Sequence, residues 1–135
     1  MANRYFTQFY WTLEKNPVTL WARVTFGALG FPTLDFANSK GFKSITRSSA
    51  GRYVVTFGTN STVQPVDIYN RLLFADACPV VASGNSASPD LTVVLDAVAT
   101  LGQVTIQFDS GGVATDPAVG EAVLLKFDLK NSTAQ

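Results

Sequence analysis

Apolar and polar residues alternate along residues 39–58, and this period of two restricts the fold more than any other feature. The side chains of Tyr53, Val55 and Phe57 fall on one face of such a segment, because successive side chains of a strand point to opposite sides. Gly51 and the serines before it supply a turn between two such runs. Residues 39–58 are therefore predicted to form a hairpin whose Tyr53 face is core.

The same alternation recurs in residues 20–26, 104–108 and 123–129. The last two ranges are predicted to be neighbouring antiparallel strands. Residues 91–98 are apolar on both faces, which favours a central strand, with a short amphipathic helix as the alternative. About eight strands separated by turn residues predict an all-β fold, a single-domain antiparallel β-sandwich of the jelly-roll type.

One domain spanning residues 1–135 is long enough to bury a core without metal or disulfide staples. The chain is 47% hydrophobic and only 15% charged, so some apolar surface is expected to be covered by a partner. Self-association into a dimer or a trimer is the simplest way to cover this apolar surface.

Residues 1–13 are predicted to be an N-terminal arm or first strand. Their polar residues fit neither a signal peptide nor a membrane span, which predicts cytoplasmic synthesis and no membrane partner.

The single cysteine, Cys78, lies in an apolar run and has no second cysteine with which to form an internal disulfide. Free cysteines are among the most buried residues in proteins. We expect Cys78 to be a small core residue, with a reactive thiol as the alternative.

The net charge is zero, but its distribution along the chain is uneven. Up to Arg52 there are seven basic and two acidic residues, and beyond it three basic and eight acidic. These charges either mix when strands of both halves interleave or provide complementary contacts between subunits. The neutral total argues against a nucleic-acid partner, which normally requires a dominant basic surface.

Catalytic chemistry has little support in the sequence. The chain has no histidine, which removes the commonest general base and the usual zinc ligands. Asp109 and Asp116 bracket a glycine-containing loop that could hold calcium, but the spacing lacks the ligands of an EF-hand. Asp96 and Asp128 could pair as in a glycosidase, although solvent-facing positions are expected. The sequence predicts no enzyme, catalytic residue, cofactor or metal.

Exposed aromatic residues are the best candidates for contacts with a partner. Large aromatic side chains are enriched at interface hot spots, and aromatics beside basic residues can also stack on nucleobases or sugars. Trp21 is expected to be an exposed strand residue or an interface anchor. The full set of interface candidates is Tyr5, Phe6, Phe9, Tyr10, Trp11 and Trp21.

Three segments together resemble the small cement or decoration proteins of tailed bacteriophage heads. They are ANRYFTQFYWTLEKNPVTLWARVTFGALG, SKGFKSITRSSAGRYVVTFG and ATDPAVGEAVLLKFDLKNST. The resemblance covers most of the chain, is weakest over residues 58–89, and rests on packing patterns. It implies a jelly roll on the outer surface of the virion, bound to the major capsid protein and stabilising its shell, with no enzyme activity.

Two other functions remain open on the sequence. One is a carbohydrate-binding head module of a phage fibre, in which Trp21 would stack on sugar rings. The other is a small hydrolase that depends on one of the carboxylates of Asp96, Asp109, Asp116 or Asp128.

Overall fold

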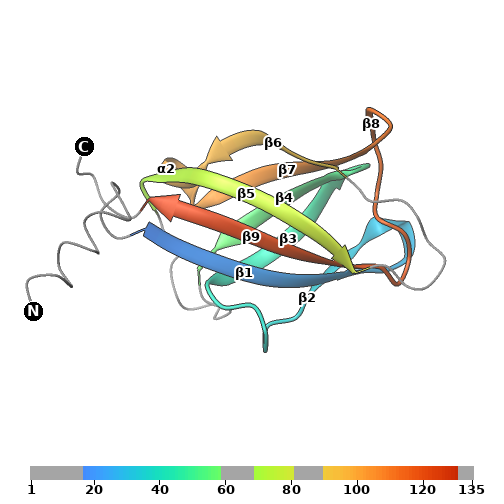
Figure 1. Cartoon of the computed structure of the whole chain (residues 1–135), viewed down its shortest axis with the longest axis horizontal. Coiled ribbons are helices and arrows are strands. Elements are labelled where there is room, and N and C mark those ends of the chain that lie inside the picture. Colours follow the sequence, from blue (N-terminus) through green and yellow to red (C-terminus); the bar gives the residue numbers. More distant parts are fainter. Residues whose placement is uncertain (1–16, 59–68, 81–89, 131–135) are drawn as a thin grey trace, which may run out of the picture.

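The computed structural model describes residues 17–58, 69–80 and 90–130, which form two packed antiparallel sheets (Figure 1). One sheet has four strands in the order β2-β1-β9-β5, and the other has the order β3-β4-β7-β6 with β8 paired to β7. The strands are β1 (Pro17–Phe26), β2 (Pro32–Leu34), β3 (Phe42–Ser49), β4 (Arg52–Phe57), β5 (Arg71–Val80), β6 (Asp90–Ala97), β7 (Gln103–Ser110), β8 (Val113–Ala114) and β9 (Ala122–Lys130). Two short helical turns, η1 (Ala28–Gly30) and α2 (Val98–Leu101), complete this part of the chain.

The sandwich predicted from the alternating pattern is confirmed, with nine strands in place of about eight. The chain passes from one sheet to the other between β2 and β3, between β4 and β5, between β5 and β6, and between β8 and β9. Such repeated crossing places strands that are distant in sequence side by side. β1 and β9, the first and last strands described, are neighbours throughout their length.

The hairpin of β3 and β4 has the predicted faces. Tyr53, Val55 and Phe57 are fully or almost fully buried, and Gly51 makes the turn with a φ of 70°. A residue with a side chain adopts this left-handed conformation only under strain. The turn therefore depends on glycine.

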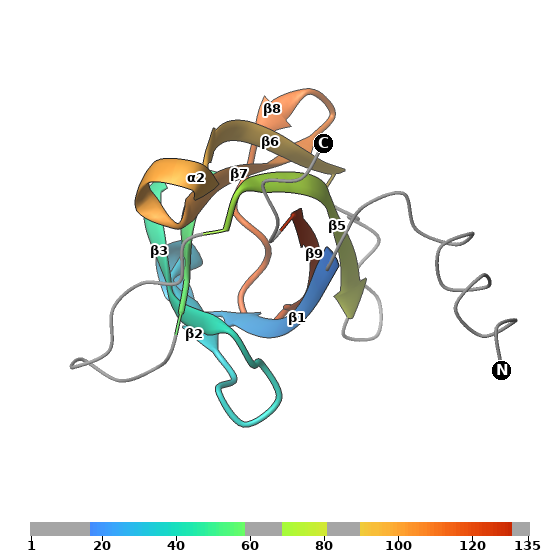
Figure 2. The ribbon, with the colours of Figure 1, turned by 90° about the vertical axis from the view of Figure 1, so that its left-hand side faces the viewer.

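The core lies between the sheets, which surround it when the molecule is viewed end-on (Figure 2). Its aromatic rings form two groups. Phe26, Tyr53 and Phe108 contact one another edge to face, and a second group contains Phe42, Phe57 and Phe127. Each buried ring contributes roughly 2–3 kcal/mol by leaving water, so these rings hold the two sheets together.

Two predictions about the arrangement of the strands are wrong. β7 and β9 lie in different sheets, because β4 and β6 occupy the two sides of β7 and the chain crosses to the other sheet after β8. The strand at residues 91–98 lies at the edge of its sheet, not in the centre, and most of its residues are exposed. Its apolar residues on both faces therefore reflect an apolar surface of the molecule.

Candidate functional site

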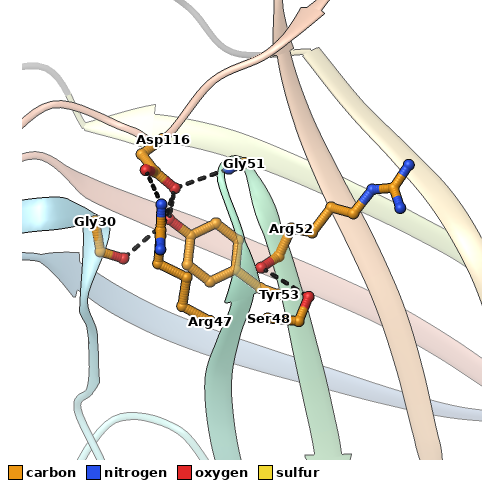
Figure 3. Close-up of polar contacts among 7 residues, drawn as sticks. All are labelled: Gly30, Arg47, Ser48, Gly51, Arg52, Tyr53 and Asp116. Atoms are coloured by element: carbon orange, nitrogen blue, oxygen red, sulfur yellow. Dashed lines mark hydrogen bonds and ion pairs between the residues drawn. The ribbon is translucent and has the colours of Figure 1, made fainter.

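A cluster of polar side chains lies at one end of the sandwich around Asp116, in the connection between β8 and β9 (Figure 3). Its carboxylate accepts two hydrogen bonds from the Arg47 guanidinium, at 3.0 and 2.7 Å, and one from the Gly51 backbone N–H at 2.8 Å. The hydroxyl of the buried Tyr53 lies 2.7 Å from the carboxylate and 2.9 Å from the Gly30 carbonyl oxygen. We call these five residues the Asp116 cluster.

The Asp116 cluster fastens three separate segments of chain to one another. The hydrogen bonds from Arg47, helped by those from Gly51 and Tyr53, lower the pKa of Asp116 from 3.8 to about 2. Burial, together with the neighbouring carboxylate, raises the pKa of Tyr53 well above its usual value. Asp116 is therefore ionised and Tyr53 neutral near pH 7. The cluster has the properties of a structural link that holds the three segments together.

The other aspartates considered from the sequence do not gather into a reaction centre. Asp96 lies on β6 and accepts a hydrogen bond from the Val98 N–H, whereas Asp128 lies on β9 in the other sheet. Asp109 accepts a hydrogen bond from Gln107, and Asp116 is held by Arg47. Over the described ranges, no three cysteine or acidic side chains are placed to hold a metal ion together.

A chain of polar side chains crosses β4 and β7 on the outer face of the five-stranded sheet. Arg52 Nε donates a hydrogen bond to Gln107 Oε1 at 2.6 Å, and Gln107 Nε2 donates one to Asp109 Oδ1 at 2.7 Å. This chain of hydrogen bonds runs across two neighbouring strands, because Arg52 and Gln107 are partners in the register. Such a face satisfies its polar groups internally and is suited to contact with water.

β5 and β6 approach each other along one side of the sandwich, and α2 contacts both (Figures 1 and 2). All three elements carry large hydrophobic side chains that are exposed on the surface. Of the thirteen exposed large hydrophobic side chains in the described part of the chain, three are on β5, three on β6 and one on α2. We call this surface the apolar side; its residues are Leu73, Phe74, Val80, Val93, Val94, Leu95 and Leu101. Both of its strands contain a register shift, at Leu73 and at Val94.

Trp21 is the only predicted interface candidate within the described residues; Tyr5, Phe6, Phe9, Tyr10 and Trp11 lie outside them. Its side chain is 60% exposed on the outer face of the four-stranded sheet. The ammonium group of Lys126 lies 5.5 Å from the centre of the Trp21 ring and 5.9 Å from that of Phe74. Whether Trp21 contacts a partner stays a prediction.

Cys78 is exposed on β5, so the prediction of a buried core cysteine is wrong. The apolar run around it belongs to an edge strand with few buried side chains. Pro79 sits in the same edge strand, where the absence of a backbone N–H is tolerated.

A hollow of about 420 Å³ opens beside Trp21. Its lining residues come from β1, from β9 and from the turn that follows β2. They are Trp21, Ala22, Arg23, Asp35, Asn38 and Leu124. We call it the Trp21 hollow; it combines one aromatic ring with a guanidinium, a carboxylate and an amide.

Sequence reasoning missed the apolar side and the Trp21 hollow. The apolar residues 91–98 are a signal for the first, but their pattern favours a central strand and not an exposed edge strand. The hollow has no local signal, since Asp35 and Asn38 reach Trp21 only through the pairing of β1 with β2.

No helix in the described ranges has the length and hydropathy that crossing a membrane requires. Comparison of the chain with protein-family models, with curated proteins and with solved structures found no match.

Proposed function

We propose that this chain is a structural protein without enzyme activity, which binds the outer surface of a bacteriophage head and stabilises the shell of the major capsid protein. The sequence resemblance suggests the class, and the apolar side is the observation that carries the proposal. Seven large hydrophobic side chains gather there on two edge strands and a helical turn. Exposed apolar side chains gathered on neighbouring elements favour contact with another protein.

The apolar side is built for side-chain packing more than for strand addition. A β-bulge disrupts the regular hydrogen-bonding edge that another strand would need, and β5 and β6 each carry one. Their side chains, including those of Leu73 and Val94, remain exposed. A protein that attaches to a lattice benefits from this arrangement, because it binds one partner surface without promoting open-ended strand pairing.

Charge at the border of the apolar side suggests what it would meet. Asp90 and Asp96 lie near the two ends of β6, Arg71 and Asp76 lie on β5, and α2 carries no charged residue. A border with both signs of charge favours a partner with complementary charges at the matching positions. We therefore propose a capsid surface with an apolar centre and a border of mixed charge as the partner.

Electron microscopy of undecorated heads mixed with the purified protein tests the proposal. We expect regular added density with the natural protein and its loss with Leu95→Lys, which places a charge among the exposed apolar residues of β6. Leu95 is 57% exposed, so the variant is expected to fold, and circular dichroism checks this. Val119→Lys is the matched control, since Val119 is 73% exposed in the connection before β9.

Two results would contradict the proposal. The first is the absence of added density with the natural protein, and the second is equal binding by Leu95→Lys. Light scattering on the same proteins measures self-association. A natural dimer or trimer that Leu95→Lys converts to monomer, without any binding to heads, would assign the apolar side to a second copy of the chain.

A further inference from the structure

We infer that the Trp21 hollow is a binding site for a neutral carbohydrate. This inference goes beyond attachment to a head and does not rest on it. The volume of about 420 Å³ falls within the range of small-molecule sites, and it is sufficient for one or two sugar rings. The evidence is the rigidity of the site, its residue types and its charge.

The wall of the hollow is fixed before any ligand arrives. The Asp35 N–H donates to the Arg23 carbonyl oxygen at 2.9 Å, and the Arg23 N–H donates to Ser39 Oγ at 2.9 Å. The turn of residues 35–39 is thus tied to β1 at both of its ends. Ser39 is buried, so this attachment is shielded from water, and little ordering is required on binding.

Within the turn, the Asp35 carboxylate orients the amide of Asn38. Asn38 Nδ2 donates to Asp35 Oδ2 at 2.7 Å, and the Ala37 N–H donates to Asp35 Oδ1 at 3.1 Å. The hydrogen bond from Asn38 is the main cause of a lowered pKa at Asp35. An amide held in this way presents its oxygen and its second N–H in a defined direction.

The residue types match the two surfaces of a sugar ring. A pyranose has faces of C–H groups and an edge of hydroxyls that both donate and accept hydrogen bonds. The exposed ring of Trp21 provides a flat apolar surface, and the ammonium group of Lys126 lies 5.5 Å from its centre. Arg23, Asp35 and Asn38 supply donors and acceptors around the same hollow.

The charge of the hollow favours a neutral ligand. Arg23 and Asp35 bear opposite charges that partly cancel at the hollow. The charge of Arg23 contributes to the lowered pKa of Asp35. A phosphate or nucleic acid would meet the Asp35 carboxylate, and an organic cation would meet Arg23. Among the described residues the Arg23 guanidinium has no hydrogen bond or ion pair of its own, so it is free to serve hydroxyl groups.

Nuclear magnetic resonance of the full ¹⁵N-labelled chain tests the inference. The probes are glucose, galactose, mannose, N-acetylglucosamine and their disaccharides at millimolar concentration. We expect at least one probe to shift the Trp21 indole and Asn38 amide signals in a saturable way. Trp21→Ala and Asn38→Ala should each weaken that binding about tenfold or more, a loss of about 1.4 kcal/mol.

Phe31→Ala is the matched control, because Phe31 is 61% exposed, against 60% for Trp21, and does not line the hollow. It should bind sugar as the natural protein does. The inference is overturned if no probe shifts these signals, if Trp21→Ala binds unchanged, or if a single-stranded oligonucleotide binds the hollow more tightly than any sugar. Attachment to heads is tested separately by Leu95→Lys, so failure of one proposal is distinguishable from failure of the other.

Discussion

The Asp116 carboxylate is expected to contribute measurably to folding stability, and Asp116→Asn removes its charge while keeping its shape. In the folded protein this carboxylate accepts hydrogen bonds from Arg47 and Gly51 and lies 2.7 Å from the Tyr53 hydroxyl. An amide in its place can accept from fewer donors and presents N–H groups toward the guanidinium. The variant should therefore weaken the links between the hairpin turn and the connection before β9.

The size of the effect follows from the pKa. Lowering the pKa of Asp116 from 3.8 to about 2 corresponds to about 2.4 kcal/mol in favour of the ionised folded state. The side chain of Asp116 is 22% exposed and that of Arg47 is 26% exposed, so solvent screening reduces the figure. We expect Asp116→Asn to lower the free energy of unfolding by about 1–2 kcal/mol near pH 7.

The sign of the pH dependence follows from the same shift. Because the folded-state pKa is below the unfolded value, the contribution is fully present above pH 3.8 and is lost as the pH falls toward about 2. The difference between the natural protein and Asp116→Asn should therefore shrink over that interval, since both then carry an uncharged group. Urea unfolding at a series of pH values measures it.

Asp90→Asn is the control for this series, because Asp90 is an exposed carboxylate at the start of β6. It should change the free energy of unfolding by less than about 0.5 kcal/mol. A difference for Asp116→Asn that is constant from pH 7 to the acid limit would refute the electrostatic reasoning. So would a difference no larger than that of the control.

Three further outcomes are expected. Gly51→Ala should destabilise the fold by about 2–3 kcal/mol in urea unfolding, because its Cβ would lie 2.6 Å from the Thr115 backbone nitrogen; Gly111→Ala, with a similar φ and open space, should lose only about 1 kcal/mol. Tyr53→Phe should lower the free energy of unfolding by about 1 kcal/mol at neutral pH. Because the pKa of Tyr53 is raised in the folded protein, the free energy of unfolding of the natural protein should decline as the pH rises above 10.0. Cys78 should react with a thiol reagent in the folded protein as fast as in urea, since it is exposed; slow reaction would contradict this.

The faces of the strands could be predicted from the sequence, because they depend on a local period of two. The alternation that assigned Tyr53, Val55 and Phe57 to the core holds in the structure. The partners of each strand could not be predicted in the same way. Only the short β8 separates β7 from β9 in sequence, yet β9 pairs with β1 and β5, because the choice of sheet depends on packing across the whole molecule.

The same limit explains the missed sites. Arg47 and Asp116 are 69 positions apart, and no local pattern links them. An apolar run such as that of β6 fits a buried strand and an exposed contact surface equally well. Only the position of β6 at the edge of its sheet distinguishes the two, and the exposed Cys78 on β5 was misassigned for the same reason.

The position of the two proposed surfaces makes their functions compatible. In the four-stranded sheet, β2 and β5 are the opposite edges. The Trp21 hollow lies at the β2 edge, where the turn of residues 35–39 contacts β1, whereas the apolar side begins at the β5 edge and continues onto β6. Lys126 lies between the two surfaces, 5.9 Å from the Phe74 ring and 5.5 Å from the Trp21 ring. A partner that is centred on β6 and leaves Phe74 uncovered therefore keeps the hollow open to solvent. Leu95→Lys should then abolish attachment without affecting sugar binding, and Trp21→Ala should do the reverse.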